Sequence, residues 1–158
     1  MESFHDPLRQ ELPRLLELAE RLRGHGDSHR RVLDTVRDEL DRFGASLVLQ
    51  MSVEERELFP LIERIEQAGP TASDDAALAA MRVRADDFVA DTRQTLRILR
   101  QITDNYVPPP TACSTLHVLY RALEELEELV QLHVHLESNV LFSRAVELAS
   151  DAGGESSK

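Results

Sequence analysis

The sequence predicts an all-α protein that folds as an antiparallel, up-down four-helix bundle. Three observations support this prediction. Apolar residues recur with the 3.6-residue period of an amphipathic helix along most of the 158 residues. Alternating apolar and polar runs, which would indicate strands, are nearly absent. Breaker-rich segments divide the periodic part into four long stretches, and short or stiff connections between long helices favour antiparallel neighbours.

The first helix is expected near residues 3–23, where leucines recur on one stripe. Residues 24–27 follow, and their two glycines beside an aspartate predict a turn. The second helix is expected near 28–67. Pro60 should bend this helix or loosen one of its backbone hydrogen bonds, because proline has no amide N–H to donate.

The third helix is expected near 73–105, since an acidic, serine-capped first turn opens it. The prolines at 108–110 cannot continue a helix and predict a stiff connection. The fourth helix is expected near 114–148. Together the helices are predicted to form one domain over 1–150, and the Gly- and Ser-rich tail 151–158 is expected to be disordered.

Composition excludes several classes of partner. The chain has 18 basic and 29 acidic residues, a formal net charge of −11, which repels the phosphate backbone of nucleic acids. Its single cysteine, Cys113, rules out an intrachain disulfide. No apolar run is long enough to cross a bilayer, and the N-terminus does not resemble a signal peptide. We therefore expect a cytoplasmic protein without a nucleic-acid or membrane partner.

One segment occurs twice. Residues 50–60 and 133–143 align so that Glu54 matches Glu137, and a Leu-Phe pair follows four residues later in both copies. A histidine stands four residues before the glutamate in the second copy, and a glutamine stands there in the first. His and Glu at positions i and i+4 project from one helix face and can hold a metal together. The repeat predicts a metal-binding bundle whose first copy has lost part of its site.

Polar side chains occupy inner-stripe positions where the periodicity calls for apolar residues. These positions are His5, Gln50, Glu54, His133 and Glu137. Buried carboxylates are costly unless they are paired or bound to a metal. One interpretation is an interior metal site, since imidazole and carboxylate ligands suit Fe, Mn or Zn. The other is that the two histidines and two glutamates pair with each other and set the helix register. Both interpretations stay open at this point.

The remaining reactive side chains are expected off the inner stripe, in loops or on the surface. They are His25, His29, His117, His135, Glu55, Glu57 and Cys113. No nucleophile–base arrangement, phosphate-binding loop or dinucleotide signature is present. An enzyme is therefore less favoured than a binding protein.

Several segments together resemble a known family. They are Phe4-His5, Leu12-Pro13, 54–60, 102–113 and 133–142. They are similar to the ligand helices and connections of hemerythrin-like (HHE cation-binding) domains, and more closely to the di-iron subgroup called repair of iron centres. The resemblance covers about residues 4–148, and it implies a hemerythrin-like four-helix bundle.

In that family, histidines from all four helices and two bridging glutamates hold a di-iron centre. Carried over residue by residue, the matching ligand positions are His5, Glu54, His133 and Glu137. Gln50 and Ala85 stand where two further histidines are expected, and His25 lies one residue before a third. His25 and Gln50 are thus weaker candidates. We expect one bound ion or none rather than a complete di-iron centre.

Two functions of different classes follow. The first is a metal-binding protein with a reduced site, with iron as the expected metal and Mn or Zn as alternatives. The resemblance implies roles in iron handling, iron–sulfur repair or the response to nitrosative and oxidative stress. The second is a metal-free pseudo-hemerythrin domain that binds a protein partner as an interaction or regulatory module. Metal analysis discriminates between the two.

Overall fold

The computed structural model describes residues 5–23, 29–144 and 147. Its α-helices are α1 (Asp6–Arg23), α2 (Arg30–Val53), α3 (Phe59–Ala68), α4 (Ala72–Ile102) and α5 (Ser114–Leu136). A first π-turn, Glu54–Leu58, joins α2 to α3, and a second π-turn, Glu137–Leu141, follows α5. No strand is found in the part of the chain that the structure describes.

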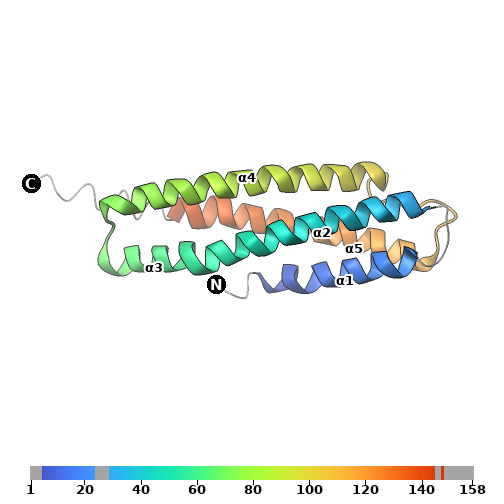
Figure 1. Ribbon diagram of the computed structural model, residues 1–158, viewed down its shortest axis with the longest axis horizontal. Helices are drawn as coiled ribbons and strands as arrows, with labels where there is room; N and C mark the ends of the chain where they lie inside the picture. The colour runs from blue at the N-terminus through green and yellow to red at the C-terminus, as the bar shows by residue number, and fades with distance from the viewer. Residues whose placement is uncertain (1–4, 24–28, 145–146, 148–158) are drawn as a thin grey trace, which may run out of the picture.

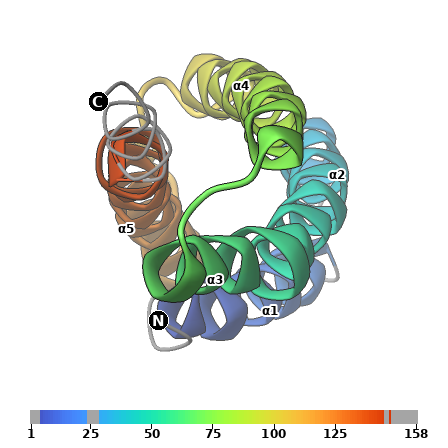
Figure 2. The same cartoon turned by 90° about the vertical axis from the view of Figure 1, so that its left-hand side faces the viewer.

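The helices form the predicted up-down bundle. α1 and α4 run in one direction, while α5 and the continuous rod of α2 and α3 run in the other (Figure 1). Seen along its axis, the bundle is a ring in which α1 packs against α2 and α5, and α2 packs against α4 (Figure 2). The prediction of an all-α four-helix bundle is confirmed. No described helix combines the length and apolar character that a bilayer-spanning segment needs.

Most predicted helix bounds agree with the structure, with one clear difference at the end of α4. This helix ends at Ile102, a few residues before the predicted 105. Residues 104–106 have φ angles of 51°, 57° and 63°, a left-handed conformation that no α-helix continues. The predicted starts at 3 and 28, the predicted end at 148 and the tail 151–158 lie outside the described residues.

The core has two apolar clusters with a polar layer between them. The larger cluster includes Met51, Phe88 and Val130. The smaller one, near the α3 end of the bundle, includes Leu58 and Phe142. On α2 and α5 the inner positions between these clusters belong to the repeated segments. The fold thus places polar side chains in the interior with apolar packing on both sides.

The α4–α5 connection is held by a buried carboxylate. Glu127 accepts hydrogen bonds from the Tyr106 hydroxyl at 2.7 Å and from Gln131 Nε2 at 2.8 Å. It also accepts from the Arg100 guanidinium at 2.8, 2.9 and 3.0 Å. Burial raises the pKa of Tyr106, so the phenol remains a neutral donor. These bonds attach the left-handed stretch 104–106 to α5.

Replacing Glu127 by alanine is expected to lower the free energy of unfolding by about 2–3 kcal/mol, because the buried Tyr106 hydroxyl and the Arg100 guanidinium would lose their acceptor. Urea denaturation measures the change. Glu128→Ala is the matched control, since Glu128 is exposed on the next position of α5. Equal losses in the two variants would contradict this account of the connection.

Candidate metal centre

Both glutamates of the repeated segment stand at the first residue of a π-turn. The amide of Phe59 donates to the carbonyl of Glu54, and the amide of Phe142 donates to the carbonyl of Glu137, each five residues back. Such turns are rare and frequently found at functional sites. The sequence analysis expected a bend or a loosened backbone bond at Pro60 in the first copy and an uninterrupted α-helix in the second, and it missed both π-turns.

The spacing of inward residues explains the first π-turn. Gln50, Glu54, Leu58 and Ile62 are all buried and succeed one another at intervals of four. In a regular α-helix, four residues advance about 400°, so each interval moves the side chain about 40° off the inner face. The wider turn absorbs this drift and keeps all four side chains inside. A run of four-residue intervals is the sequence signal that could have located it.

Pro60 is not the common cause of the two π-turns. It lies in the first turn of α3, directly after the first π-turn, where a missing amide N–H is tolerated. The second copy has Ser143 at the matching position and still forms its π-turn. The π-turns therefore have a cause that both copies share, separate from the bend or loosened bond expected at Pro60.

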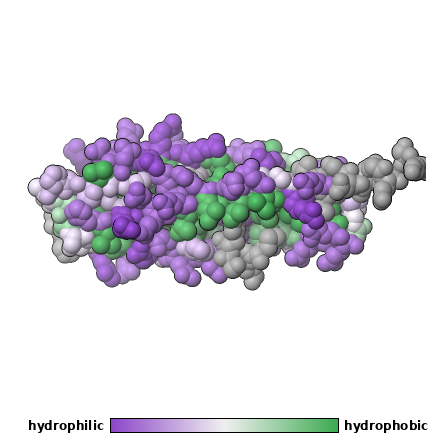
Figure 3. Space-filling model, turned by 180° about the vertical axis from the view of Figure 1, so that it is seen from behind, coloured by the Kyte–Doolittle hydropathy of each residue, from purple (hydrophilic) through white to green (hydrophobic). Residues whose placement is uncertain are grey.

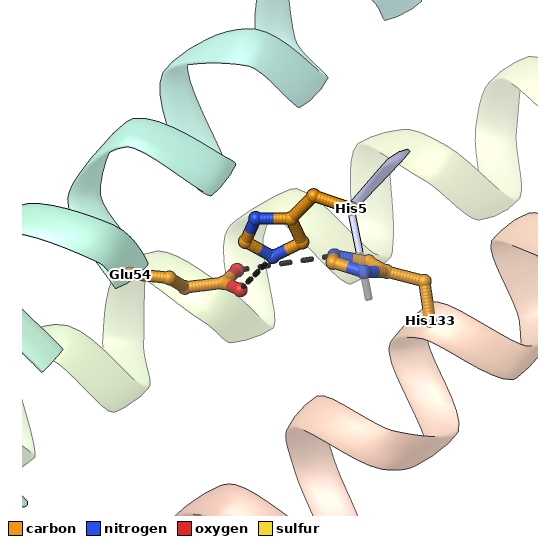
Figure 4. A group of neighbouring side chains, drawn as sticks. All are labelled: His5, Glu54 and His133. Atoms are coloured by element: carbon orange, nitrogen blue, oxygen red, sulfur yellow. Dashed lines mark hydrogen bonds and ion pairs between the residues drawn. The ribbon is translucent and has the colours of Figure 1, made fainter. Parts of the chain in front are cut away.

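The polar residues predicted on the inner stripe converge between the two apolar clusters. Their exposed fractions are 0% for His5, 8% for Gln50, 1% for Glu54, 2% for His133 and 0% for Glu137. Figure 4 shows side chains from three elements pointing toward one another: His5 just before α1, Glu54 on the first π-turn and His133 on α5. The topology thus brings distant parts of the chain into one buried pocket.

The two carboxylates form the middle of the pocket. His5 Nε2 lies 2.9 Å from Glu54 Oε2. The Gln50 side-chain amide donates to Glu54 Oε1 at 3.0 Å and to Glu137 Oε1 at 2.5 Å. His133 Nε2 lies 3.8 Å from Glu54 Oε1 and 3.9 Å from Glu137 Oε2. One ligand atom each of His5, Glu54 and His133 lies within 4.8 Å of the others, which is close enough to share an ion.

Protonation in the pocket is set by burial and by the carboxylates. Burial lowers the pKa of His133, so its neutral imidazole keeps a lone pair for a cation. Burial also acts to lower the pKa of His5, but hydrogen bonds to Glu54 and Glu55 outweigh it and raise that pKa. Burial raises the pKa of Glu137, and the charge of Glu54 adds to this effect. A bound cation would take the place of these protons.

The donor set fits a metal ion. Glu137 Oε2 is buried and accepts no hydrogen bond from the described residues. An uncompensated carboxylate oxygen in an interior is costly, and coordination to a cation removes that cost. Two imidazoles and two carboxylates are ligands that suit Fe, Mn or Zn.

Comparison with known proteins identifies one family over almost the whole chain. The chain matches the hemerythrin HHE cation-binding domain over residues 1–151. It belongs to this family. It is 31% identical over 145 residues to a probable iron-sulfur cluster repair protein of Haemophilus influenzae. It is 33% identical over 144 residues to the iron-sulfur cluster repair protein YtfE of Dickeya chrysanthemi, and 33% identical over 153 residues to YtfE of Musicola paradisiaca.

These alignments cover 90%, 90% and 92% of this hemerythrin domain chain and 60%, 61% and 62% of the three relatives. The chain therefore spans about three fifths of the length of these relatives.

At Ala85, the α4 position that the sequence singled out, this hemerythrin domain offers no ligand atom. Ala85, where the resemblance expects a histidine, is 2% exposed and packs in the smaller apolar cluster. The rings of Phe88 and His133 stand at 89° to each other, with centroids 6.2 Å apart. Gln50, the other substituted position, lies within hydrogen-bond distance of both carboxylates. His25 lies outside the described residues.

The position of Glu55 differs from the one that the sequence predicted. The sequence analysis assigned it to surface charge, but it is 25% exposed and its Oε1 lies 2.7 Å from both His5 Nδ1 and Arg9 Nη2. The periodicity of one helix could not reveal this contact, because His5 lies fifty positions earlier in the chain. A carboxylate on the far ring nitrogen orients a histidine and increases its basicity. Glu55 therefore orients the His5 ring and is not simply a surface charge.

The other side chains expected off the inner stripe lie near the surface. His117, His135, Glu57 and Cys113 are exposed, as predicted. His29 is half-buried directly before α2, so the expectation that it is exposed holds only in part.

Replacing Glu55 by glutamine is expected to weaken metal affinity by about 10- to 100-fold, because His5 would lose the carboxylate that orients its ring. Equilibrium competition with a chromogenic chelator measures the affinity. Glu57→Gln, two residues away and exposed, removes the same charge without touching His5. If both variants lose affinity equally, the effect is one of net charge and the orienting role of Glu55 is wrong.

Proposed function

We propose that this hemerythrin domain binds a metal ion, with iron as the expected metal, and that it acts in iron–sulfur cluster repair or iron handling. The observation that carries the proposal is the meeting of two buried glutamates and two buried histidines in one pocket. Further support comes from the relatives, which are named as iron–sulfur cluster repair proteins. For this chain, a role in cluster repair, in iron handling or in the response to nitrosative and oxidative stress is a proposal.

Each residue of the pocket has a distinct proposed role. Glu54 and Glu137 supply negative charge that compensates the cation. His133 supplies a neutral nitrogen, and His5 a second nitrogen whose ring is held by Glu55. Gln50 donates to both carboxylates and keeps them side by side. When bound, iron would supply redox chemistry or a coordination position for a small ligand.

We further propose that the pocket holds one ion rather than two. The proposal rests on the absence of imidazoles at Gln50 and Ala85, since di-metal sites in helical bundles draw ligands from all four helices. The test is metal analysis of protein purified without chelator, combined with its optical spectrum. We expect about one equivalent of iron, and no near-ultraviolet bands of an oxo-bridged pair. Two equivalents would overturn the reduced site.

A second candidate is a metal-free module that binds a protein partner. The observation that favours it is that side chains of the pocket contact one another directly: His5 with Glu54, and Gln50 with Glu137. Thermal unfolding with and without a chelator separates the two candidates. A ligand that binds only the folded state raises the unfolding temperature. A chelator should therefore lower it for the metal protein and leave it unchanged for the metal-free module.

Metal affinity is expected to rise with pH. The pKa of His5 lies above its ordinary value of 6.5, and that of Glu137 is also raised, so a proton must leave each group before it can coordinate. Protons therefore compete with the metal most strongly at low pH, and affinity should keep increasing above pH 6.5. Chelator competition at a series of pH values measures this trend. A flat profile would exclude both groups as ligands.

A further inference from the structure

A groove of about 1070 Å³ separates α4 from α5. The helices on the other three sides of the ring pack more closely (Figure 2). Seen from behind, the molecule shows apolar side chains along the middle of a largely hydrophilic face (Figure 3). The groove is large enough for a small organic molecule, since such ligands occupy sites of about 300–1,000 Å³.

The α4 wall of the groove is basic. It carries Arg82, Arg93, Arg97 and Arg100. Asp86 pairs with the first of these arginines and Glu127 with the last. Arg93 and Arg97, one helical turn apart and both exposed, form no ion pair with a carboxylate of the described residues; Arg97 donates instead to the neutral amide oxygen of Gln94. In a chain of net charge −11, two adjacent uncompensated guanidinium groups form a local anion-attracting site.

The lining is mixed: polar side chains such as Glu127, Gln131 and Asn139 line it beside an apolar strip. Val89 and Leu96 line it from α4, and Val130 and Val134 from α5. Thr92 also lines the groove, is 3% exposed, and its hydroxyl has no hydrogen-bond partner in the described part of the chain. A buried hydroxyl normally finds a partner. Thr92 also lines a smaller cavity beside α2, and a ligand in the α4–α5 groove would supply the missing partner.

We propose that the α4–α5 groove binds a small amphiphilic organic anion, with its carboxylate at Arg93 and Arg97 and its hydrocarbon part against the apolar strip. The planar guanidinium fork matches a carboxylate. Thr92 donates its hydroxyl to the same head group. The apolar strip disfavours a fully polar anion such as free phosphate. This site uses none of the candidate metal ligands and does not depend on the proposed metal function.

Decanoate is the probe, titrated into the full chain by isothermal calorimetry. We expect saturable binding of one decanoate per chain, and roughly tenfold or greater weakening in the double variant Arg93→Gln/Arg97→Gln, because both charged donors are removed. Arg84→Gln is the control: this arginine is exposed on the same helix but does not line the groove. Metal content should be unchanged in all variants, which separates this test from that of the metal centre.

Thr92→Val tests the buried hydroxyl with a side chain of nearly the same shape. It is expected to weaken decanoate binding several-fold without lowering thermal stability, since the hydroxyl has no partner to lose. The proposal would be overturned by no saturable binding, by equal affinity in the double variant and the Arg84 control, or by displacement of decanoate by inorganic phosphate at equal concentration. Equal binding of uncharged decanol would show that the arginines play no part, and would also overturn it.

Discussion

Replacing His133 by alanine is expected to abolish metal binding. This imidazole is 2% exposed and lies within 4 Å of both Glu54 and Glu137, at 3.8 and 3.9 Å. It is the nitrogen donor whose lowered pKa keeps it neutral and ready to coordinate. Its loss should weaken affinity by more than about 100-fold, beyond the 10- to 100-fold cost of removing an outer-sphere partner. Metal analysis after dialysis against a limiting metal concentration measures the change.

The control is His135→Ala. His135 lies two positions further along α5, is exposed, and interacts with Asn139 rather than with the pocket. It should leave metal content unchanged. Circular dichroism of both variants checks that the bundle remains folded. Retention of metal by folded His133→Ala protein would exclude His133 as a ligand and would favour the metal-free interpretation of the pocket.

The double variant Gln50→His/Ala85→His is expected to raise metal stoichiometry from about one ion toward about two per chain. Gln50 already places its side-chain nitrogen 3.0 Å from Glu54 and 2.5 Å from Glu137, so an imidazole there would face both carboxylates. Ala85 is the buried α4 position at which the resemblance expects a histidine, and it packs in the smaller apolar cluster. Metal analysis and the near-ultraviolet bands of a bridged iron pair report the second ion.

Packing must be separated from ligation in this experiment. Ala85 is 2% exposed, so a larger side chain strains the core in any case. Gln50→His/Ala85→Leu adds bulk at the same place without a second ligand and should gain no second ion. If the unaltered protein already holds two ions, the interpretation of Gln50 and Ala85 as lost ligands is wrong. If the double variant stays at one ion while folded, the α4 position does not face the metal.

The prediction of four helices succeeded because long amphipathic stretches and breakers are local properties of the chain. The end of α4 was placed a few residues too far along because the left-handed stretch 104–106 is held by Glu127 of α5, which local patterns do not reveal. The polar inner positions were identified for the same local reason. A His or Glu at a position where the periodicity calls for an apolar residue lies on the inner face of its helix, and this alone predicts that its side chain is buried.

Side-chain contacts between distant segments could not be predicted in this way. Glu55 lies one position beyond Glu54 and was assigned to solvent, yet α1 brings His5 against it. The first π-turn had a signal in the four-residue spacing of buried positions, but its presence depends on packing against the facing helices. The α4–α5 groove has no local signal, since it arises from the distance between two helices.

The sequence by itself determined the helical class, the order and extent of the helices, the family resemblance, and which polar side chains face inward. Each of these follows from patterns within about ten residues along the chain or from the repeated segment. Only the tertiary structure decided that Gln50 bridges both carboxylates, that Glu55 holds His5, and that α4 and α5 leave a basic groove. These features depend on separations between helices, and helix separations are set by the packing of all the side chains between them.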